Sequence, residues 1–434
     1  MISDAIAYLR GKGLVIPNTT PQGGSLRVDF SHLSSWDAAF VGARTTTPSG
    51  SGRAGLYYPG CNLCSTTGSV YLYGLRETVA DRSNLALVNI GTGQAISLRV
   101  TLFSGQAGDS RNLVLSPDIT LEPGQWQQLN SVLSQAGFSN GYALIERISG
   151  SDPYLAYAVI NDNVTNDGSF VPAIPVFRPT SNDNFEYLPT VTPVVLETAL
   201  FESELILANP NLQPMGATLQ YAESLASPRG TKGFVTETLE PGEQKIIPGA
   251  IQYLRNKGAE IGPSGGRYAG AVFVDFFANE PFIEGFVGAR TAAAGPAGGR
   301  YGLFTPGSLP SEAAGNEGWV FGLKQDDTTR SNLALINVMP GGFITVQYEV
   351  FDGTTGIKAA TSNPISIPPD GWIQINNVLK TAGVSNGYIR VVKIADDPYY
   401  VKGQRFLAYG VINDGAESSS GTNDGSFVPM IPTN

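Results

Sequence analysis

The chain has 434 residues, a formal charge of −10 and a pI near 4.8. It is too long for one hydrophobic core and corresponds to roughly three to four domains of about 100–150 residues each. The excess of acidic residues argues against nucleic-acid binding, which needs clustered Lys and Arg, and no run of about 20 apolar residues predicts a membrane span.

The first segment of the chain has a helix motif without the strands that come before that motif elsewhere. MISDAIAYLRGKG predicts a short helix ending at Gly13, and it carries Asp4 and Arg10 where a signal peptide has an apolar stretch. The same Leu-x-x-x-Gly pattern follows predicted strands at Leu133/Gly137, Leu254/Gly258 and Leu379/Gly383. Residues 1–60 therefore correspond to the C-terminal half of a repeat.

Three whole repeats follow this half. The motif Ser-x-Leu-x-Leu-x-Asn occurs at residues 83–89, 203–209 and 331–337. After the first copy, apolar residues alternate with polar ones from Ile96 to Leu102, which is the period of a half-buried strand. A Pro-Gly or Asp-Gly turn, a short strand and the helical turn come next, and the glycine of the helix motif is suited to end that turn in the left-handed conformation.

Each whole repeat has about seven short strands, so the sequence predicts an all-β fold of tandem antiparallel β-sandwich (immunoglobulin-like) domains, each with one short connector helix. The expected domains are unit 1 (1–60, a half sandwich whose N-terminal strands are missing), unit 2 (61–175), unit 3 (176–307) and unit 4 (308–434). Units 2 and 4 share NDGSFVP, whereas units 1 and 3 share FVGART, so the units alternate in type. We expect separate, similar cores strung end to end.

Half a sandwich exposes its inner face and leaves sheet edges unpaired. Unit 1 therefore implies either that the chain is a fragment of a longer protein, which we favour, or that another chain supplies the missing strands. The second alternative includes other copies of the same chain.

The motifs RSNLALVN, LEPG, NGY and VIND…NDGSFVP resemble tandem β-sandwich repeats of secreted and cell-surface proteins of environmental bacteria. The alternate units resemble the second member of such pairs. The resemblance implies an extracellular or cell-surface location and a spacer or accessory role without catalysis of its own.

Few residues suggest catalysis. Cys61 and Cys64 stand in a loop-like segment, which favours a local disulfide or inert thiols over redox or metal chemistry. His32 is the single histidine and has no counterpart in the other units, so a structural role is favoured over that of a general base.

Acidic loops close units 2 and 4. Asp162, Asp167, Asp414 and Asp424 lie in Gly- and Asn-containing segments, where such residues usually form turns by bonding their own backbone. Calcium is the alternative, because hard oxygen ligands in flexible loops suit this ion at extracellular concentrations. We expect the arginines of the preceding Arg-Ser-Asn motifs, Arg82 and Arg330, to make structural contacts with these loops. No other cofactor is expected.

Aromatic residues are candidates for sugar stacking. Trp126 and Trp372 occupy equivalent positions, which favours a core role over a sugar platform, and Trp36 and Trp319 are further candidates. The pairs Tyr57-Tyr58 and Tyr399-Tyr400 border predicted loops and are expected at the surface.

The repetition without a catalytic set predicts a non-catalytic structural or spacer array of a secreted or surface-displayed bacterial protein, with adhesion as a further role. The alternative is a carbohydrate-binding accessory module. A glycoside-acting enzyme, which would need two converging carboxylates, ranks third.

Overall fold

The computed structural model describes residues 1–18, 23–30, 40–60, 66–176, 190–226, 232–278, 285–309, 312–396 and 403–433. Its described elements are almost all antiparallel strands, which confirms the predicted all-β sandwich fold. Within these residues, no helix has the length and apolar character needed to cross a membrane.

Unit 2 is a sandwich of two antiparallel sheets. One sheet has the strand order β11-β10-β4-β8, and the other has β12-β3-β9-β5-β6 with β7 also paired to β5. The elements are β3 (Val70–Arg76), β4 (Asp81–Asn89), β5 (Ile96–Ser104), β6 (Asn112–Val114), β7 (Ile119–Leu121), β8 (Trp126–Leu129), the 3-10 helix η2 (Val132–Ala136), β9 (Asn140–Ser149), β10 (Tyr154–Asp162), β11 (Gly168–Pro172) and β12 (Ile174–Pro175).

Unit 4 repeats this topology, with sheets β29-β28-β22-β26 and β30-β21-β27-β23-β24, and β25 also paired to β23. The elements are β21 (Glu317–Lys324), β22 (Thr329–Asn337), β23 (Ile344–Asp352), β24 (Lys358–Thr361), β25 (Ile365–Ile367), β26 (Trp372–Ile375), α3 (Val378–Thr381), β27 (Asn386–Asp396), β28 (Phe406–Asp414), β29 (Gly425–Pro429) and β30 (Ile431–Thr433).

Unit 3 arranges equivalent strands in one sheet, β16-β15-β18-β13-β14-β19-β20, with β17 paired to β14. The strands β13 and β14 are paired at a single register position, Glu197 with Glu202, and β13 also contacts β19. The sheet therefore folds over into two layers. The elements are β13 (Thr190–Glu197), β14 (Phe201–Ala208), β15 (Met215–Glu223), β16 (Lys232–Leu239), β17 (Gln244–Ile247), α2 (Ala250–Asn256), β18 (Tyr268–Phe277), β19 (Phe286–Ala294), η3 (Pro296–Gly298) and β20 (Arg300–Pro306).

Unit 1 contributes the helix α1 (Ala5–Gly11) and a hairpin of β1 (Gly42–Ser49) and β2 (Gly52–Pro59). These elements are equivalent to α2, β19 and β20 of unit 3. The glycine that follows each helical segment has a positive φ, as predicted: 93° at Gly13, 66° at Gly137, 96° at Gly258 and 70° at Gly383.

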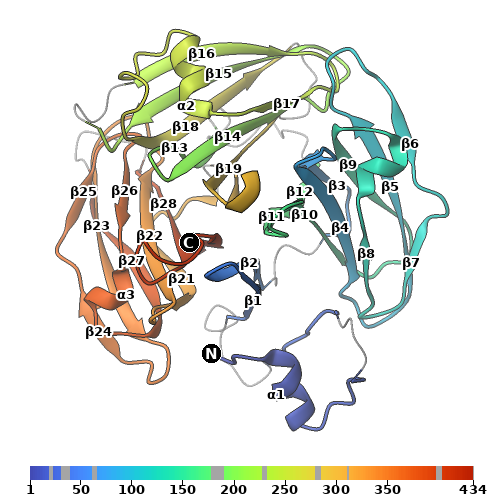
Figure 1. Cartoon of the computed structure of the whole chain (residues 1–434), viewed down its shortest axis with the longest axis horizontal. Coiled ribbons are helices and arrows are strands. Elements are labelled where there is room, and N and C mark those ends of the chain that lie inside the picture. The colour runs from blue at the N-terminus through green and yellow to red at the C-terminus, as the bar shows by residue number, and fades with distance from the viewer. Residues whose placement is uncertain are drawn as a thin grey trace.

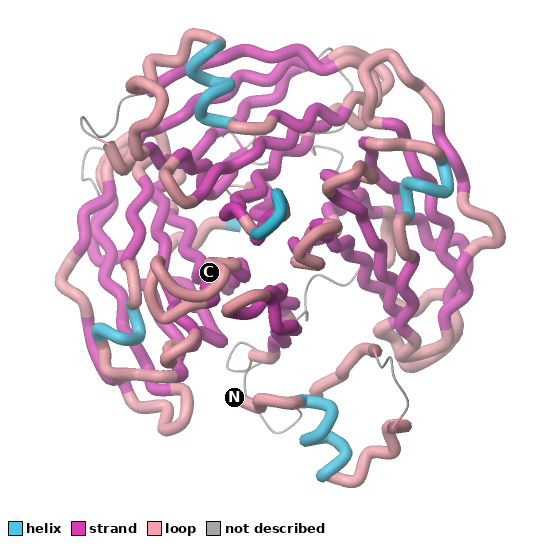
Figure 2. The backbone as a smooth tube through the Cα atoms, viewed as in Figure 1, coloured by secondary structure: helices cyan, strands magenta, loops and turns pink. Residues whose placement is uncertain are grey.

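The units close around a common axis and do not run in a line as expected (Figure 1). The hairpin of unit 1 and the strand β11 lie near the centre, and the larger sheets lie around them (Figure 1, Figure 2). In this central bundle β2 contacts β11 and β29, and β20 contacts the same two strands. Three core clusters are centred on units 2, 3 and 4, but the cluster of unit 2 includes Ile206 and Phe286 of unit 3, so the cores are not separate as expected. A further apolar cluster joins unit 3 to unit 4 through side chains such as Phe273, Ile336 and Trp372.

Glycine permits two of the central contacts. A Cβ atom built on Gly168 would lie 2.6 Å from Leu56, and one built on Gly425 would lie 2.6 Å from Leu303. The two glycines occupy equivalent positions in units 2 and 4, so the same close approach occurs twice around the axis.

Candidate functional site: the axial hub and cavity

The centre of the molecule holds a polar hub that joins unit 2 to unit 3. The backbone N–H of Gly302 donates to Oδ2 of Asp167 (2.7 Å), and the Ser169 hydroxyl donates to the Gly302 carbonyl (2.9 Å). The Nε of Arg290 donates to the Ser169 Oγ (3.0 Å). These bonds fix β20 of one unit beside β11 of the other.

The same set of bonds joins unit 4 to unit 1. Gly55 N–H donates to Oδ2 of Asp424 (2.7 Å), Ser426 donates to the Gly55 carbonyl (3.3 Å), and Arg44 Nε donates to the Ser426 Oγ (3.0 Å). The hub therefore has an approximate two-fold relation, which follows from the alternation of unit types in the sequence.

The two hub carboxyl groups meet at the axis. Asp167 and Asp424 are fully buried, and the Oδ1 atom of each has no hydrogen-bond partner among the described residues. Burial raises the pKa of Asp167 to about 7, although Gly302 N–H and Arg290 favour its ionised form. Burial and the charge of Asp167 together raise the pKa of Asp424 well above its usual range. Two carboxyl groups in contact cannot both ionise without penalty, so the pair holds one proton at neutral pH.

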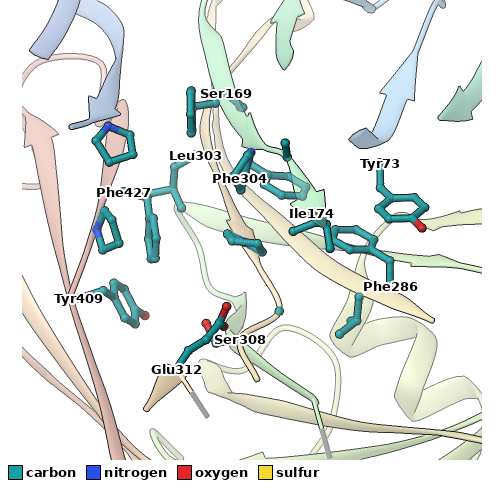
Figure 3. Close-up of a pocket in the computed structure, with 18 of the residues that line it drawn as sticks. Tyr73, Ser169, Ile174, Phe286, Leu303, Phe304, Ser308, Glu312, Tyr409 and Phe427 are labelled. Carbon is teal, nitrogen blue, oxygen red and sulfur yellow. The ribbon is translucent and has the colours of Figure 1, made fainter. Parts of the chain in front are cut away.

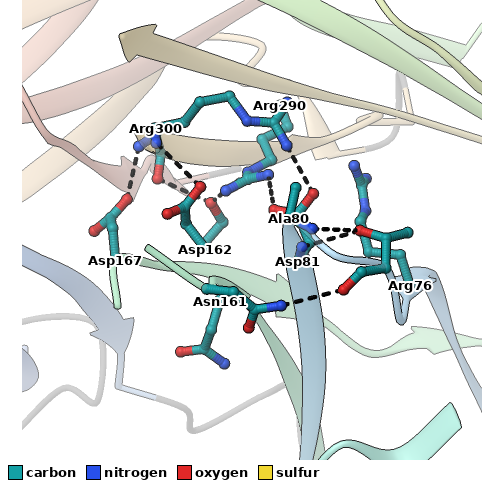
Figure 4. A network of polar contacts seen from close by, with 12 residues as sticks. Arg76, Ala80, Asp81, Asn161, Asp162, Asp167, Arg290 and Arg300 are labelled. Carbon is teal, nitrogen blue, oxygen red and sulfur yellow. Dashed lines mark hydrogen bonds and ion pairs between the residues drawn. The ribbon is translucent and has the colours of Figure 1, made fainter. Parts of the chain in front are cut away.

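Buried ion pairs surround the hub between units 2 and 3 (Figure 4). Asp81 accepts from Arg290 (2.9 Å) and Arg300 (2.7 Å), and Glu204 contacts Arg76 at 2.6 Å. Burial alone would lower the pKa of Arg290, but the carboxylates of Glu204 and Asp81 raise it overall. The arginine is thus held in its charged form and bridges the two units.

The sequence analysis did not single out Arg290 or its counterpart Arg44. A signal was present, because each is the only charged residue of the strand motif FVGART in units 1 and 3. In a strand whose other positions are apolar or small, a repeated arginine indicates a buried partner of opposite charge.

The remaining loop carboxylates, like those of the hub, accept hydrogen bonds from the protein. Asp162 Oδ1 accepts from the backbone of Val164 (3.0 Å) and Thr165 (2.8 Å), and Asp414 Oδ2 accepts from the backbone of Thr422 (2.7 Å). Over the described part of the chain, no three His, Cys, Asp or Glu side chains gather in a group that could hold a metal ion. Calcium at the four aspartates remains a prediction.

The expected contacts of the two Arg-Ser-Asn motifs are present. Arg82 donates to the side-chain oxygens of Asn163 (2.8 Å) and Asn166 (3.1 Å). Arg330 donates to the side-chain oxygen of Asn423 (2.7 Å) and to backbone carbonyls such as that of Gly415 (2.8 Å). Both arginines therefore hold the loop that precedes the axial strand of their unit.

An apolar cavity of about 660 Å³ lies beside the hub on the axis (Figure 3). All four units line it through residues of their central strands. Leu56 of unit 1 is equivalent to Leu303 of unit 3, and Phe170 of unit 2 is equivalent to Phe427 of unit 4. Tyr73 and Phe286 extend the aromatic wall, and Ser308 and Glu312 supply polar groups. Because most of its lining is hydrocarbon or aromatic, the cavity suits an apolar ligand better than a sugar.

The two equivalent tryptophans occupy equivalent structural positions. Trp372 is buried and Trp126 is half-buried. Trp372 Nε1 donates to the hydroxyl of Tyr409 (3.2 Å), and Trp126 Nε1 donates to that of Tyr157 (3.0 Å). With their polar groups used inside the protein, these two rings give little support to a sugar platform.

The surface position expected for the pair Tyr57-Tyr58 is wrong for Tyr57, and Tyr58 is half-buried. Tyr57 is 5 % exposed and belongs to the core of unit 4, while Tyr58 packs edge-on against Tyr157 and Phe170. Burial raises the pKa of both phenols. The sequence pattern placed them next to a loop, but the closure of the ring covers them.

Several predicted site residues lie outside the described residues, namely Cys61, Cys64, His32, Trp36, Tyr399 and Tyr400. The disulfide between the two cysteines therefore stays a prediction.

Comparison with protein-family models finds no match to this chain, and comparison with curated proteins finds none either. The functional argument therefore depends on the residues and geometry described above.

Proposed function

We propose that the protein is a non-catalytic structural module of a secreted or surface-displayed bacterial protein, with the ring of sandwiches as a stiff support. The observation that carries this proposal is the hub, whose buried Arg, Asp and Ser side chains all bond one unit to another. Groups used in this way stabilise an arrangement of domains, and they are not free to contact a substrate. The resemblance of the repeats to extracellular spacers supports the location.

The nearest enzymatic alternative would use the carboxyl pair Asp167 and Asp424, because paired carboxyl groups with separated pKa values can act as acid and base. Both side chains are fully buried, which argues against contact with a polysaccharide. The test is to incubate the purified chain with a panel of polysaccharides and aryl glycosides and to compare it with the Asp167→Asn variant. We expect no hydrolysis by either protein. Saturable hydrolysis that the variant loses would refute the structural proposal.

A second candidate function is the binding of a small apolar molecule in the axial cavity, favoured by its size and lining. Leu303→Trp would fill part of the space, whereas Val79→Trp, on a side chain that is 98 % exposed, is the matched control. We expect the fluorescence of a bound apolar dye, such as 1-aminoanthracene, to fall with Leu303→Trp and to stay unchanged with the control. Equal dye binding by all three proteins would exclude the cavity as its site.

A further inference from the structure

The axial cavity reaches the surface of the molecule beside an acidic side chain. Ser308 and Glu312, which follow β20, both belong to the cavity lining, and Glu312 is exposed to solvent. Figure 3 shows these two residues together at one side of the cavity, with the rings of Tyr409 and Phe427 on one flank and that of Phe286 on the other. The cavity therefore has an apolar interior and a mouth that carries a carboxylate.

The cavity is a property of the strands at the axis and of their immediate neighbours. Unit 3 contributes residues between Gly285 and Leu309, and no described residue of 190–278 lines the cavity. Unit 1 contributes part of β2. The other walls come mainly from β3, β10 and β11 of unit 2 and from β28 and β29 of unit 4. The site is therefore built from elements that the structure describes in all four units.

Aromatic rings form much of the interior. Tyr409, Phe286 and Phe304 are 5 %, 6 % and 2 % exposed, and all three line the cavity. Phe286 also stacks on Tyr73 at a centroid distance of 4.5 Å, so its ring is held by a neighbour. The faces of such rings carry partial negative charge, and they attract a cation that lies within about 6 Å. An apolar ligand with a positive group would therefore be favoured by the walls as well as by the mouth.

The serine hydroxyls on the hub side of the cavity already have partners. Ser169 donates to the Gly302 carbonyl (2.9 Å), and Ser426 donates to the Gly55 carbonyl (3.3 Å). Because these serines bond one unit to another, they require no hydrogen bond from a ligand. A polar group on the ligand would be better placed at the mouth, where solvent and the Glu312 carboxylate can bond to it.

Glu312 is the one charged residue among the described residues that line the cavity, and none of these residues is Lys, Arg or His. The hub arginines Arg290 and Arg300 are already paired with Asp81, at 2.9 Å and 2.7 Å. A ligand with a carboxylate head group would meet a like charge at the mouth and would lose part of its hydration without gaining a partner. An ammonium group would instead gain a charge-assisted hydrogen bond.

The Glu312 carboxylate is held in place before any ligand binds. Leu309 N–H donates to its Oε2 (2.8 Å), and the backbone N–H of Glu312 donates to the Leu309 carbonyl (2.9 Å), which closes a tight turn. One residue before this turn, the N–H of Val191 in β13 donates to the Ser308 carbonyl (2.9 Å). The mouth is thus anchored to the sheet of unit 3, so little conformational entropy is lost there when a ligand binds.

We propose that the axial cavity binds a hydrophobic amine, which is a molecule with an apolar body and one protonated amino group. The amino group lies beside the Glu312 carboxylate, and the apolar body lies among the aromatic rings. A cavity of about 660 Å³ is within the range of small-molecule sites in proteins. The inference rests on the second candidate function, the binding of an apolar molecule in this cavity, and it names the chemical class of that molecule.

The test measures how competitors displace 1-aminoanthracene from the full chain at pH 7. The competitors are decylamine, decanol and decanoic acid, which share one alkyl chain and differ in the head group, each below its critical micelle concentration. At this pH the amine is protonated and the acid is ionised. We expect decylamine to displace the dye at about three- to tenfold lower concentration than decanol, and decanoic acid to need a higher concentration than decanol. High salt should reduce the advantage of the amine, because it screens charges at the mouth.

Three variants assign the effect to the cavity. Glu312→Gln removes the charge but keeps an oxygen that can accept from Leu309 N–H, so the affinity for decylamine should fall to that for decanol, while the affinity for decanol stays the same. Glu122→Gln is the matched control, because it removes one negative charge from an exposed turn between β7 and β8 that does not line the cavity. It should change none of the three affinities, although the whole chain is acidic. Leu303→Trp should weaken all three.

The outcomes separate the inference from the candidate function on which it rests. Equal affinities for decylamine and decanol, or equal effects of Glu312→Gln and Glu122→Gln, would overturn the inference while apolar binding in the cavity stands. Tighter binding of decanoic acid than of decanol would overturn it in favour of an anionic ligand. If no competitor displaces the dye and calorimetric titration of the chain with decylamine gives no binding heat, the inference and the second candidate function both fail.

Discussion

The axial carboxyl pair predicts an unusual dependence of stability on pH, which the substitution Asp167→Asn should remove. In the folded protein the pair keeps a proton that the unfolded chain releases near pH 4. Folding therefore takes up a proton between about pH 4 and the raised pKa of about 7. Stability from this pair is fully present below pH 4 and is lost as the pH rises through 7.

The size of the effect follows from the pKa difference. The pKa of Asp167 rises from 3.8 to about 7, or about 3 units. At about 1.4 kcal/mol for each unit, the pair loses at most about 4 kcal/mol of stability between pH 4 and pH 8. Arg290 and Arg44 face the pair and oppose the loss, and Asp414 adds to it.

Asparagine is a close substitute for the protonated acid. Its amide oxygen can accept from Gly302 N–H while its Nδ2 donates to Asp424, so both contacts of the protonated pair are kept. We expect Asp167→Asn to have about the stability of the original chain near pH 4.5. At pH 8 we expect it to be more stable by up to about 4 kcal/mol.

The assay is urea unfolding followed by tryptophan fluorescence at pH 4.5, 6, 7 and 8. The control is Asp109→Asn. Hydrogen bonds from Arg111 lower the pKa of this half-buried carboxyl, so the stability that it contributes is present above its unfolded pKa and is lost only at more acidic pH. The difference between this variant and the original chain should therefore be nearly the same at all four pH values. If the stability difference between Asp167→Asn and the original chain does not change with pH, the shared proton is refuted. Carbon NMR signals showing both hub carboxyls ionised at pH 6 would refute it independently.

Three further predictions concern contacts described above. Arg290→Met leaves the buried carboxylate of Asp81 without its buried partner and should destabilise the protein by about 3–5 kcal/mol. Arg99→Met breaks a more exposed ion pair and should cost much less. Equal losses in urea unfolding would contradict the hub. Trp372→Phe keeps an aromatic ring but loses the hydrogen bond to Tyr409, which should lower the free energy of unfolding by about 1 kcal/mol in addition to the loss from cavity formation. If the original chain binds a polysaccharide and this variant does not, our interpretation of Trp372 as a core residue is wrong. Removal of divalent cations with EDTA should leave the melting temperature unchanged, because the loop carboxylates already accept hydrogen bonds from the protein. A fall of several degrees in the melting temperature that added calcium reverses would establish a calcium site.

Local patterns in the sequence were sufficient for the sandwich fold. The alternation from Ile96 to Leu102 became β5 because a strand places successive side chains on opposite faces. The glycines that end the helical turns have the predicted left-handed conformation because other residues are strained there. The contacts of Arg82 and Arg330 were predictable too, since both arginines and their partner loops belong to the same repeat.

The candidate site was not predictable in the same way, because its residues come from different units. Asp167 and Asp424 are 257 positions apart (424 − 167) in the chain, and each resembles an ordinary turn residue until the other is placed beside it. Tyr57 shows the same limit: its neighbours in sequence are loop residues, but its neighbours in space belong to the core of unit 4.

The sequence by itself determined the strands and their alternation into two unit types, since both depend on local periodicity and repetition. Only the tertiary structure decided that the units surround an axis, that two carboxyl groups are buried there, and that Tyr57 of unit 1 belongs to the core of unit 4. The physical reason is that burial and charge pairing depend on distances in space, and repeated local patterns do not specify how one repeat packs on the next.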